Sequence, residues 1–255
     1  MGILNEIKNA LFVTPEGIGE RGERKIINTL GLLSLCGKRR KILKNVYIPK
    51  EDGSTSEIDI LYITEKGLIV IESKNFSGYI FGNENNRNWT ATLYAGKTWF
   101  GRNKVEKYHF YNPVWQNNSH IRALKNYLGT NLQAISIIVF SNRCEIKALS
   151  MERDCTFICK EKELPHVIKD IWHSYPSILD DLQIYSIYDS LKPLTNQDQA
   201  TRERHIKEIM SKESGEVCPV CGGNLILRTA KKGIQTGHQF WGCSNYPRCR
   251  YTRNL

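Results

Sequence analysis

Apolar positions in the first part of the chain follow two periods, one helical and one strand-like. Hydrophobic residues at 26, 27, 30 and 33 share a face of a predicted helix over residues 19–35. A second helix is predicted over residues 113–128, because proline suits a first helical turn and Gly129 a helix end. Short apolar runs between turn residues predict strands at 42–49, 57–64, 68–75, 79–81, 89–94, 98–100 and 134–140.

The remaining pattern divides the chain. Residues 145–195 combine one predicted strand, at 156–160, with helical stretches. The polar and charged segment 196–215 predicts a helix that becomes a linker. We therefore expect a large α/β domain over residues 1–195, a linker over 196–216 and a small domain over 217–255.

Charge is concentrated at the end of the chain. The net charge of the 255 residues is +10. Residues 217–255 contain six Lys and Arg and no Asp or Glu, so these 39 residues carry +6 and the other 216 carry 10 − 6 = +4. Dense positive charge favours a polyanion, because each neutralised phosphate releases counterions. No apolar run approaches the ~18–20 residues of a membrane helix, and the first residues do not resemble a signal peptide, so a cytoplasmic protein is expected.

Four of the eight cysteines have the spacing of a metal site. Cys218 and Cys221 form a Cys-x-x-Cys turn, and Cys243 and Cys249 form a second pair with five residues between them. Four thiolates around one Zn²⁺ give the tetrahedral coordination of structural zinc sites. Because this segment is short, it buries little apolar surface, and the metal is expected to supply folding energy. The other four are expected to be buried or partly buried thiols: Cys36, Cys144, Cys155 and Cys159.

Aromatic rings and arginines alternate around the second cysteine pair. Rings beside guanidinium groups hold unpaired bases without reading their sequence. The alternative is that the rings merely cover the zinc, as we expect of Phe240. The predicted nucleic-acid contacts are Trp241, Tyr246, Arg248, Arg250, Tyr251 and Arg253.

The order of residues in this segment resembles the C-terminal zinc finger of type IA DNA topoisomerases. It has Cys-Pro-x-Cys-Gly-Gly, then Phe-Trp-Gly-Cys-Ser-Asn-Tyr-Pro-x-Cys-x-Tyr-Thr, and the resemblance runs from Cys218 to Thr252. It implies a small zinc-ribbon domain that binds single-stranded DNA. It does not imply topoisomerase activity, because the catalytic body of that enzyme could not fit in the rest of the chain.

Charged residues stand in two apolar strands of the large domain. Asp59 lies in the middle of one, and the next ends in Glu72 and Lys74, which share a face because they are two residues apart. Buried charge is costly unless it is paired or bound to metal. Two carboxylates from adjacent strands could hold Mg²⁺, and a neighbouring lysine could orient the attacking water.

Two further residues fit the same chemistry. Glu23 shares a helix face with Ile27 and Leu30, and Gln116 could hydrogen-bond the lysine, a water or a phosphate. Structural alternatives stay open for these residues. Glu23 could stand in a helix's first turn only because acids are favoured there. Glu72 and Lys74 could form a strand-end salt bridge, and Asp59 could cap a bulge.

The ordered set resembles the nuclease-related domain (NERD), a branch of the PD-(D/E)xK nuclease superfamily. The resemblance covers residues 17–128, although Ile58 stands where the superfamily often has proline. It implies an α/β restriction-endonuclease-like core, with a central mixed sheet flanked by helices, and a catalytic set of Glu23, Asp59, Glu72, Lys74 and Gln116. The matching residues are Gly22-Glu23, Ile58-Asp59, Val70-Ile71-Glu72-Ser73-Lys74-Asn75 with Gly78, Trp89 and Asn112-Pro113-Val114-Trp115-Gln116.

The combined pattern favours a metal-dependent nuclease that hydrolyses DNA phosphodiester bonds. Asp59 and Glu72 are the expected ligands of a catalytic Mg²⁺ or Mn²⁺, and the structural Zn²⁺ module would bind single-stranded, branched or distorted DNA. One alternative is a non-catalytic DNA-binding or repair accessory protein that keeps the nuclease fold as a scaffold. Another is an RNA-processing enzyme, because a metal site does not distinguish the two sugars.

Overall fold

The computed structural model describes two compact units, Met1–Asn196 and Gln197–Leu255. In the first unit the described residues are 16–34, 40–51, 53–97, 103–147 and 155–195. In the second they are 218, 225–230, 237–244, 246–247 and 249–254.

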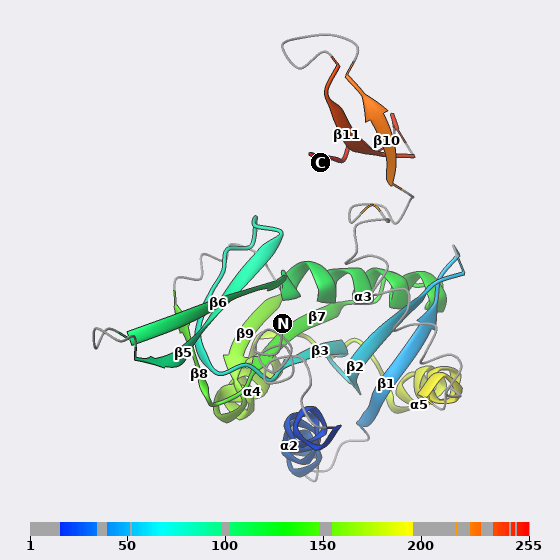
Figure 1. Ribbon diagram of the computed structural model, residues 1–255. Helices are drawn as coiled ribbons and strands as arrows, with labels where there is room; N and C mark the ends of the chain where they lie inside the picture. Colours follow the sequence, from blue (N-terminus) through cyan, green and yellow to red (C-terminus); the bar gives the residue numbers. More distant parts are fainter. Residues whose placement is uncertain are drawn as a thin grey trace. The chain divides into compact units, whose positions relative to one another are not determined.

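A five-stranded mixed sheet forms the centre of the first unit (Figure 1). Its order is β1-β2-β3-β7-β9; the β1–β2 and β2–β3 pairs are antiparallel, and the β3–β7 and β7–β9 pairs are parallel. The strands are β1 Lys41–Pro49, β2 Thr55–Thr64, β3 Gly67–Lys74, β7 Ala134–Phe140 and β9 Thr156–Lys160.

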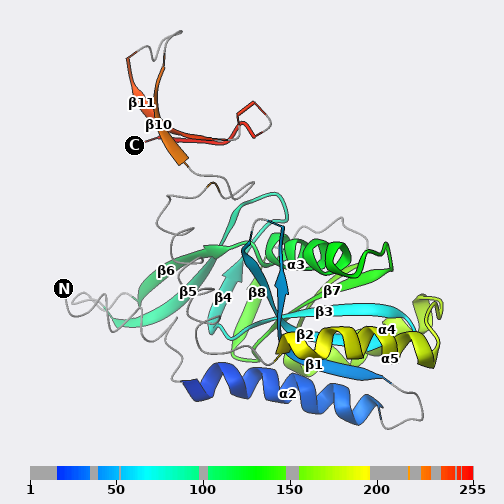
Figure 2. The same cartoon turned by 90° about the vertical axis from the view of Figure 1, so that its right-hand side faces the viewer.

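Helices cover both faces of this sheet. Ile26 and Ile168, from α2 and α4, belong to one hydrophobic cluster with sheet residues. Leu124 and Ile184, from α3 and α5, belong to the cluster on the other face. Figure 2 shows α2 below the central strands and α3 above them. The helices are α2 Glu16–Ser34, α3 Pro113–Leu128, α4 Leu164–Ser174 and α5 Asp181–Leu191, with short 3-10 turns η1 Glu161–Glu163 and η2 Lys192–Thr195. The expected α/β class, with a central mixed sheet flanked by helices, is confirmed.

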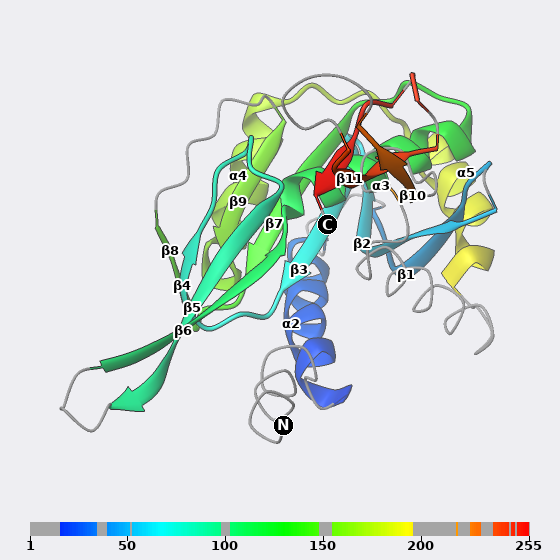
Figure 3. The same ribbon diagram turned by 45° about the horizontal axis from the view of Figure 1, so that its top comes forward.

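A second mixed sheet extends to one side of the first (Figure 3). Its order is β6-β5-β4-β8, with β4 Gly78–Phe81, β5 Asn88–Lys97, β6 Asn103–Tyr111 and β8 Cys144–Lys147. Trp89 of β5 is buried and stacks on Phe140 of β7, with ring centroids 6.3 Å apart and an interplanar angle of 8°. Val114, at the start of α3, belongs to the same cluster. The second sheet therefore packs beside the first turn of α3.

The sequence pattern misses two strands of this second sheet. β6 has polar or charged residues on both faces, at 103, 107 and 109 and at 104 and 106, so the alternation that marks a strand is interrupted, and the four-residue β8 is too short to show a period. The predicted helix over 19–35 begins earlier, at Glu16, and is described to Ser34. The strand predicted at 98–100 lies outside the described residues. None of the described helices combines the length and apolar character needed to cross a bilayer.

The thiols of the first unit are largely buried, as expected. Cys144 and Cys159 are buried and Cys155 is partly buried, whereas Cys36 lies outside the described residues. Burial raises the pKa of Cys159 to about 12, and it also raises the pKa of Cys144. A thiol that stays protonated is a poor nucleophile and metal ligand.

The second unit is a three-stranded antiparallel sheet in the order β10-β11-β12. The strands are β10 Leu225–Thr229, β11 Gln239–Cys243 and β12 Thr252–Asn254. Leu225 and three cysteines form its buried cluster. The expected small C-terminal domain is confirmed.

A buried ion pair joins the β2–β3 turn to the helices on one face. The guanidinium of Arg40 donates to both carboxylate oxygens of Glu65, at 3.0 and 3.1 Å, and lies 4.1 Å from the ring centroid of Trp172. Trp172 Nε1 donates to Glu65 Oε1 at 2.8 Å. Burial opposes ionisation, but the hydrogen bonds and charge of Arg40 lower the pKa of Glu65 to about 2.

We predict that Glu65→Gln destabilises the first unit because it leaves the Arg40 charge buried without its partner. Urea unfolding at pH 7 should show a loss of about 3 kcal/mol. The folded pKa of Glu65 lies below its unfolded value, so its contribution is complete above an unfolded pKa of about 4.3 and is lost as the pH falls towards 2.

The difference between the two proteins should therefore shrink when unfolding is repeated at pH 3. Glu145→Gln is the control, because its ion pair with Lys147 is exposed to solvent. A pH-independent difference, or an equal loss in the control, would contradict this account.

Candidate metal centre and nucleic-acid interface

Asp59 stands where β2 and β3 diverge. Their pairing ends at Ile60 and Ile71, so the next backbone N–H on that side has no strand partner, and Ser73 N donates instead to Asp59 Oδ2 at 2.8 Å. Ile58 and Ile60 would share a face of a regular strand, yet they belong to clusters on opposite faces of the sheet. The alternation of side chains between the two faces of β2 is therefore interrupted at Asp59. The hydrogen bond from Ser73 holds the Asp59 carboxylate beside the end of β3.

Glu72, Lys74 and Gln116 form a hydrogen-bonded chain at that strand end. Lys74 Nζ donates to Glu72 Oε1 at 2.7 Å and to Gln116 Oε1 at 3.0 Å. Glu72 is buried, at 2% exposure. The lysine therefore links the last residues of β3 to the first turn of α3.

The pKa values of the site follow from burial and mutual charge. Burial and the negative charge of Glu72 raise the pKa of Asp59 well above its ordinary value, against the opposing charge of Lys74. Burial would also raise the pKa of Glu72, but Lys74 and the ring of His120 lower it to about 2. The site thus holds one firmly ionised carboxylate and one whose charge is disfavoured until a cation arrives.

Glu23 reaches the same region from α2. Its negative charge adds to the rise in the pKa of Asp59. The preceding residue, Gly22, is buried, and a Cβ there would lie 3.7 Å from Ser73 Oγ. The helix therefore passes close to the end of β3, and all five residues of the predicted catalytic set lie in one region of the first unit.

Asn112 caps the N-terminus of α3 and ties it to the loop before β5. Its Oδ1 accepts from Val114 N at 2.9 Å and caps α3, and Pro113 occupies the first turn. Its Nδ2 donates to three backbone carbonyls of the loop before β5, at 2.8 to 3.3 Å. Trp115 Nε1 donates to one of the same carbonyls, that of Glu84, at 2.8 Å. This clamp fixes where α3 starts, and hence where Gln116 points.

His120 is a site residue that the sequence analysis missed. It lies one turn after Gln116 on α3, with its Nδ1 2.7 Å from Ser56 Oγ and its Nε2 3.5 Å from Glu72 Oε2. The 3.5 Å separation is long for a hydrogen bond. Neither His120 Nε2 nor Glu72 Oε2 has a hydrogen-bond partner in the described part of the chain. The i, i+4 spacing from Gln116 could have indicated it.

The oxygens of Asp59 and Glu72 fit a divalent cation. Mg²⁺ in proteins is typically held by one or two carboxylates while it keeps several waters. The buried Glu72 Oε2 lacks a hydrogen bond, and the charge of Asp59 is disfavoured by its neighbours, so a cation would improve both environments. Within the described residues, the acidic groups do not form a cluster of three mutually close ligands, so waters would complete the coordination.

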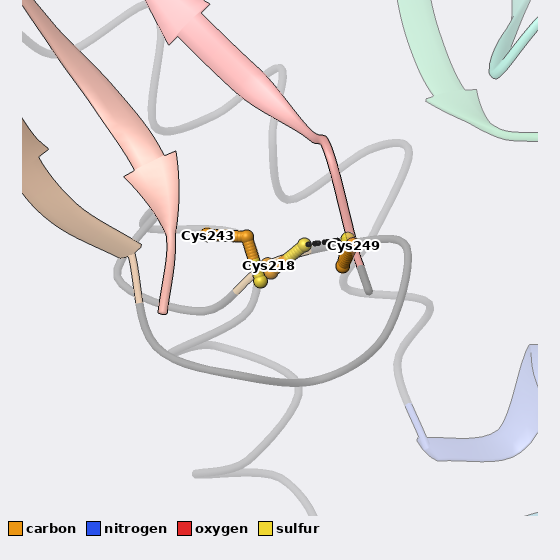
Figure 4. A group of neighbouring side chains, drawn as sticks. All are labelled: Cys218, Cys243 and Cys249. Carbon is orange, nitrogen blue, oxygen red and sulfur yellow. Dashed lines mark hydrogen bonds between the residues drawn. The ribbon is translucent and has the colours of Figure 1, made fainter. Parts of the chain in front are cut away.

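Three cysteines of the second unit converge on one point (Figure 4). The Sγ atoms of Cys218, Cys243 and Cys249 all lie within 4.8 Å of one another, and those of Cys218 and Cys249 are 3.6 Å apart. Two thiolates bound to one Zn²⁺ at about 2.3 Å are about 3.8 Å apart in a tetrahedron. All three are buried. The cluster is consistent with a structural zinc site; the fourth predicted ligand, Cys221, lies outside the described residues.

The aromatic residues of this unit divide into two groups. Trp241 and Tyr251 pack against the cysteine cluster, whereas Tyr246 is 61% exposed. Arg250 and Arg253 are exposed, and Arg248 lies outside the described residues. The expectation that Phe240 covers the zinc is wrong: residues alternate along β11, so Trp241 and Cys243 share a face and Phe240 points to the other.

Arg228 is a second missed residue. It pairs with Phe240 across the strands, its Nη2 donates to Cys243 O at 3.3 Å, and its guanidinium lies 5.8 Å from the ring centroid of Tyr246. A Cβ on Gly242 would come within 2.8 Å of Arg228 Cδ. The glycine of the Trp-Gly-Cys sequence therefore gives this arginine room to lie across the sheet.

Comparison with protein families identifies both parts of the chain. Residues 18–141 match the nuclease-related domain family, and residues 215–255 match the topoisomerase DNA binding C4 zinc finger family. The chain therefore carries a nuclease-related domain followed by a topoisomerase-type, DNA-binding class of zinc finger. Both resemblances expected from the sequence are confirmed.

Individual relatives divide in the same way. An uncharacterized protein of Bacillus anthracis is 27% identical over 199 residues, which cover 78% of this chain and 86% of that protein. DNA topoisomerase 1 of Methanocaldococcus jannaschii is 49% identical over 50 residues, or 20% of this chain and only 6% of the enzyme. The uncharacterized YrdD of Escherichia coli is 45% identical over 42 residues, covering 16% of this chain and 21% of YrdD. No solved structure matches the chain.

We predict one zinc ion per chain, measured by elemental analysis of protein kept reduced throughout. Cys243→Ser should release it and unfold the second unit, because the metal supplies folding energy there. Cys155→Ser, which removes a thiol of the first unit, should keep the full zinc content. Metal-free parent protein, or zinc loss in both variants, would refute the cysteine site.

Proposed function

We propose that the chain is a divalent-metal-dependent nuclease that hydrolyses DNA phosphodiester bonds. One observation carries this proposal: Lys74 Nζ, Glu72 and Gln116 meet at a strand end where Asp59 is held by the N–H of Ser73. Two carboxylates, of Asp59 and Glu72, and the ammonium group of Lys74 thus lie together where β2 separates from β3. The match of residues 18–141 to the nuclease-related domain supports the same chemistry.

Each residue has a role that suits its position. Asp59 and Glu72 hold Mg²⁺ or Mn²⁺, which when bound polarises the phosphate and lowers the pKa of a bound water. Lys74 balances the charge of the phosphate and orients the attacking water, and Gln116 holds the lysine in place. Glu23, from α2, adds a third carboxylate near Asp59 and Glu72.

The second unit serves the first by holding DNA. Trp241, Tyr246 and Tyr251 would stack on unpaired bases, and Arg248, Arg250 and Arg253 would neutralise phosphates, which favours single-stranded, branched or distorted DNA. We assign residues 1–195 to the nuclease, 196–216 to a linker and 217–255 to the zinc finger. The family match of residues 215–255 supports the DNA-binding role.

Cleavage of labelled DNA by matched variants tests the proposal. Asp59→Asn, Glu72→Gln and Lys74→Met should each lower the rate with Mg²⁺ or Mn²⁺ by more than ~100-fold, because each removes a group that acts on the reacting atoms. Glu57→Gln is the control: its carboxylate lies on the same strand as Asp59 but accepts a hydrogen bond from Tyr47. EDTA should abolish cleavage by the parent.

Binding and melting temperature should be measured on the same variants. In EDTA the DNA affinity of Asp59→Asn and Glu72→Gln should stay close to that of the parent, since neither change touches the zinc finger. If the parent cuts neither single-stranded, duplex nor branched DNA, and the variants lose only stability, the site is a structural scaffold. Faster cleavage of RNA than of DNA would reassign the substrate.

His120 should act as a positioning residue for Glu72. His120→Ala should weaken binding of Mn²⁺ by about 10–100-fold, as losses around metal ligands commonly do. Calorimetric titration of the DNA-free protein measures this without reference to activity. Ser56→Ala, which removes the hydroxyl beside His120 Nδ1, should give a smaller loss in the same direction. Unchanged Mn²⁺ affinity in His120→Ala would show that the ring is only packing.

A further inference from the structure

One face of the four-stranded sheet carries several exposed side chains among the described residues. The inner face carries Ile80, Trp89 and Phe110, which are buried against the central sheet and α3. Side chains at alternate positions point to the outer face, which we call the aromatic face. Strand pairing places these described residues on it: Tyr79, Phe81, Asn88, Thr90, Thr92, Val105, Lys107, His109, Tyr111, Glu145 and Lys147.

Large rings on this face are exposed to solvent. Tyr79 is 49% exposed, Phe81 is 42% exposed and Tyr111 is 39% exposed. The rings of Tyr79 and Phe81 are neighbours on β4, with centroids 6.5 Å apart. Leaving aromatic carbon in water is unfavourable, and a contiguous exposed group of rings marks an interaction site.

Positive and polar groups surround these rings. Lys147 Nζ lies 5.5 Å from the ring centroid of Tyr79, and Lys107 is exposed. Thr90 Oγ1 lies 3.0 Å from His109 Nδ1 across the strands. Glu145 is the single acidic residue among the described residues of the face, and Lys147 Nζ lies 2.9 Å from its carboxylate. This charge suits a phosphate backbone better than an acidic or purely apolar partner.

The aromatic face leads to the candidate metal centre. Tyr111, at the end of β6, packs edge-on against Trp115, with centroids 6.3 Å apart and an interplanar angle of 74°. Trp115 precedes Gln116, which accepts from Lys74. Burial raises the pKa of Tyr111 while the nearby charges of Arg87 and Arg122 oppose that rise, so both cations lie at the same end of the face.

We propose that the aromatic face binds an unpaired nucleic-acid strand, with bases stacked on Tyr79, Phe81 and Tyr111 and phosphates near Lys107 and Lys147. Paired bases are already stacked inside a duplex, so exposed rings select single strands. The strand would then run past Trp115 to Lys74. Delivery to that site rests on the proposed nuclease function, whereas binding to the face does not.

Anisotropy with a labelled single-stranded DNA, in EDTA and with the full chain, tests the binding. Tyr79→Ala and Phe81→Ala should each weaken binding by about 5- to 100-fold, the loss expected of one stacked base. Tyr127→Ala is the matched control, since it removes a tyrosine of similar exposure, 42%, from the other end of α3. Lys107→Ala and Lys147→Ala should each make the DNA affinity less dependent on salt concentration, by roughly the amount expected for the loss of one phosphate contact.

The zinc finger should be weakened in parallel so that it cannot hide the effect. Repeating the series with Tyr246→Ala, which removes an exposed ring of the second unit, should preserve the same losses. Affinities equal to that of Tyr127→Ala, or an equal loss of duplex binding, would overturn stacking on this face. A change of oligomeric state in sedimentation, without loss of DNA affinity, would overturn it in favour of a protein interface.

The two proposals fail in different ways. If Tyr79→Ala and Phe81→Ala weaken binding while the parent cleaves nothing, the aromatic face stands and the nuclease assignment falls. If those variants bind and cleave like the parent while Asp59→Asn is inactive, the nuclease stands and the aromatic face falls.

Discussion

A partly buried lysine joins the central sheet of the first unit to helix α3. Lys74 Nζ lies between Glu72 Oε1 and Gln116 Oε1, and Glu72 is almost fully buried. Burying such charges is unfavourable unless each has partners. The rest of the region supplies them: Asn112 fixes the start of α3 so that Gln116 reaches the lysine, and the opening of β2 from β3 brings Asp59 to the same strand end.

The two units rely on different forces. The first has three hydrophobic clusters around its sheets, and its polar site lies at the end of β3 among them. The second has a buried cluster of three cysteines and Leu225, with Trp241 and Tyr251 packed against it. This cysteine cluster is consistent with a structural zinc site, and a metal bound there would supply folding energy. Under the proposed function, removal of metal would affect stability in the second unit and chemistry in the first.

Both units combine aromatic rings with cations, but in different ways. In the second unit Arg228 lies across Gly242 towards the exposed Tyr246, while the half-buried Trp241 and Tyr251 pack against the cysteines. In the first unit the exposed rings lie on the aromatic face with lysines between them. This arrangement would let each unit contact a single strand separately. The net charge of the chain would favour such contacts with a polyanion.

Periodicity in the sequence predicted most of the helices and strands, and the spacing of the cysteines indicated the zinc site. The class of fold and the members of the proposed catalytic set were implied by resemblance to known families. The sequence did not reveal β6, whose polar residues on both faces interrupt the apolar alternation, or the aromatic face that β6 completes. Nor did it show His120: the i, i+4 spacing places this residue on the same helix face as Gln116, but its approach to Glu72 is set by the packing of α3 on the sheet. It assigned the covering of the zinc site to Phe240, whereas strand alternation gives that position to Trp241. Tertiary structure decided these points because strand pairing and helix packing join residues that are distant in sequence. Only the tertiary structure shows the reversal of facing between Ile58 and Ile60, which puts Asp59 beside Ser73, because the two side chains pack on opposite faces of the sheet.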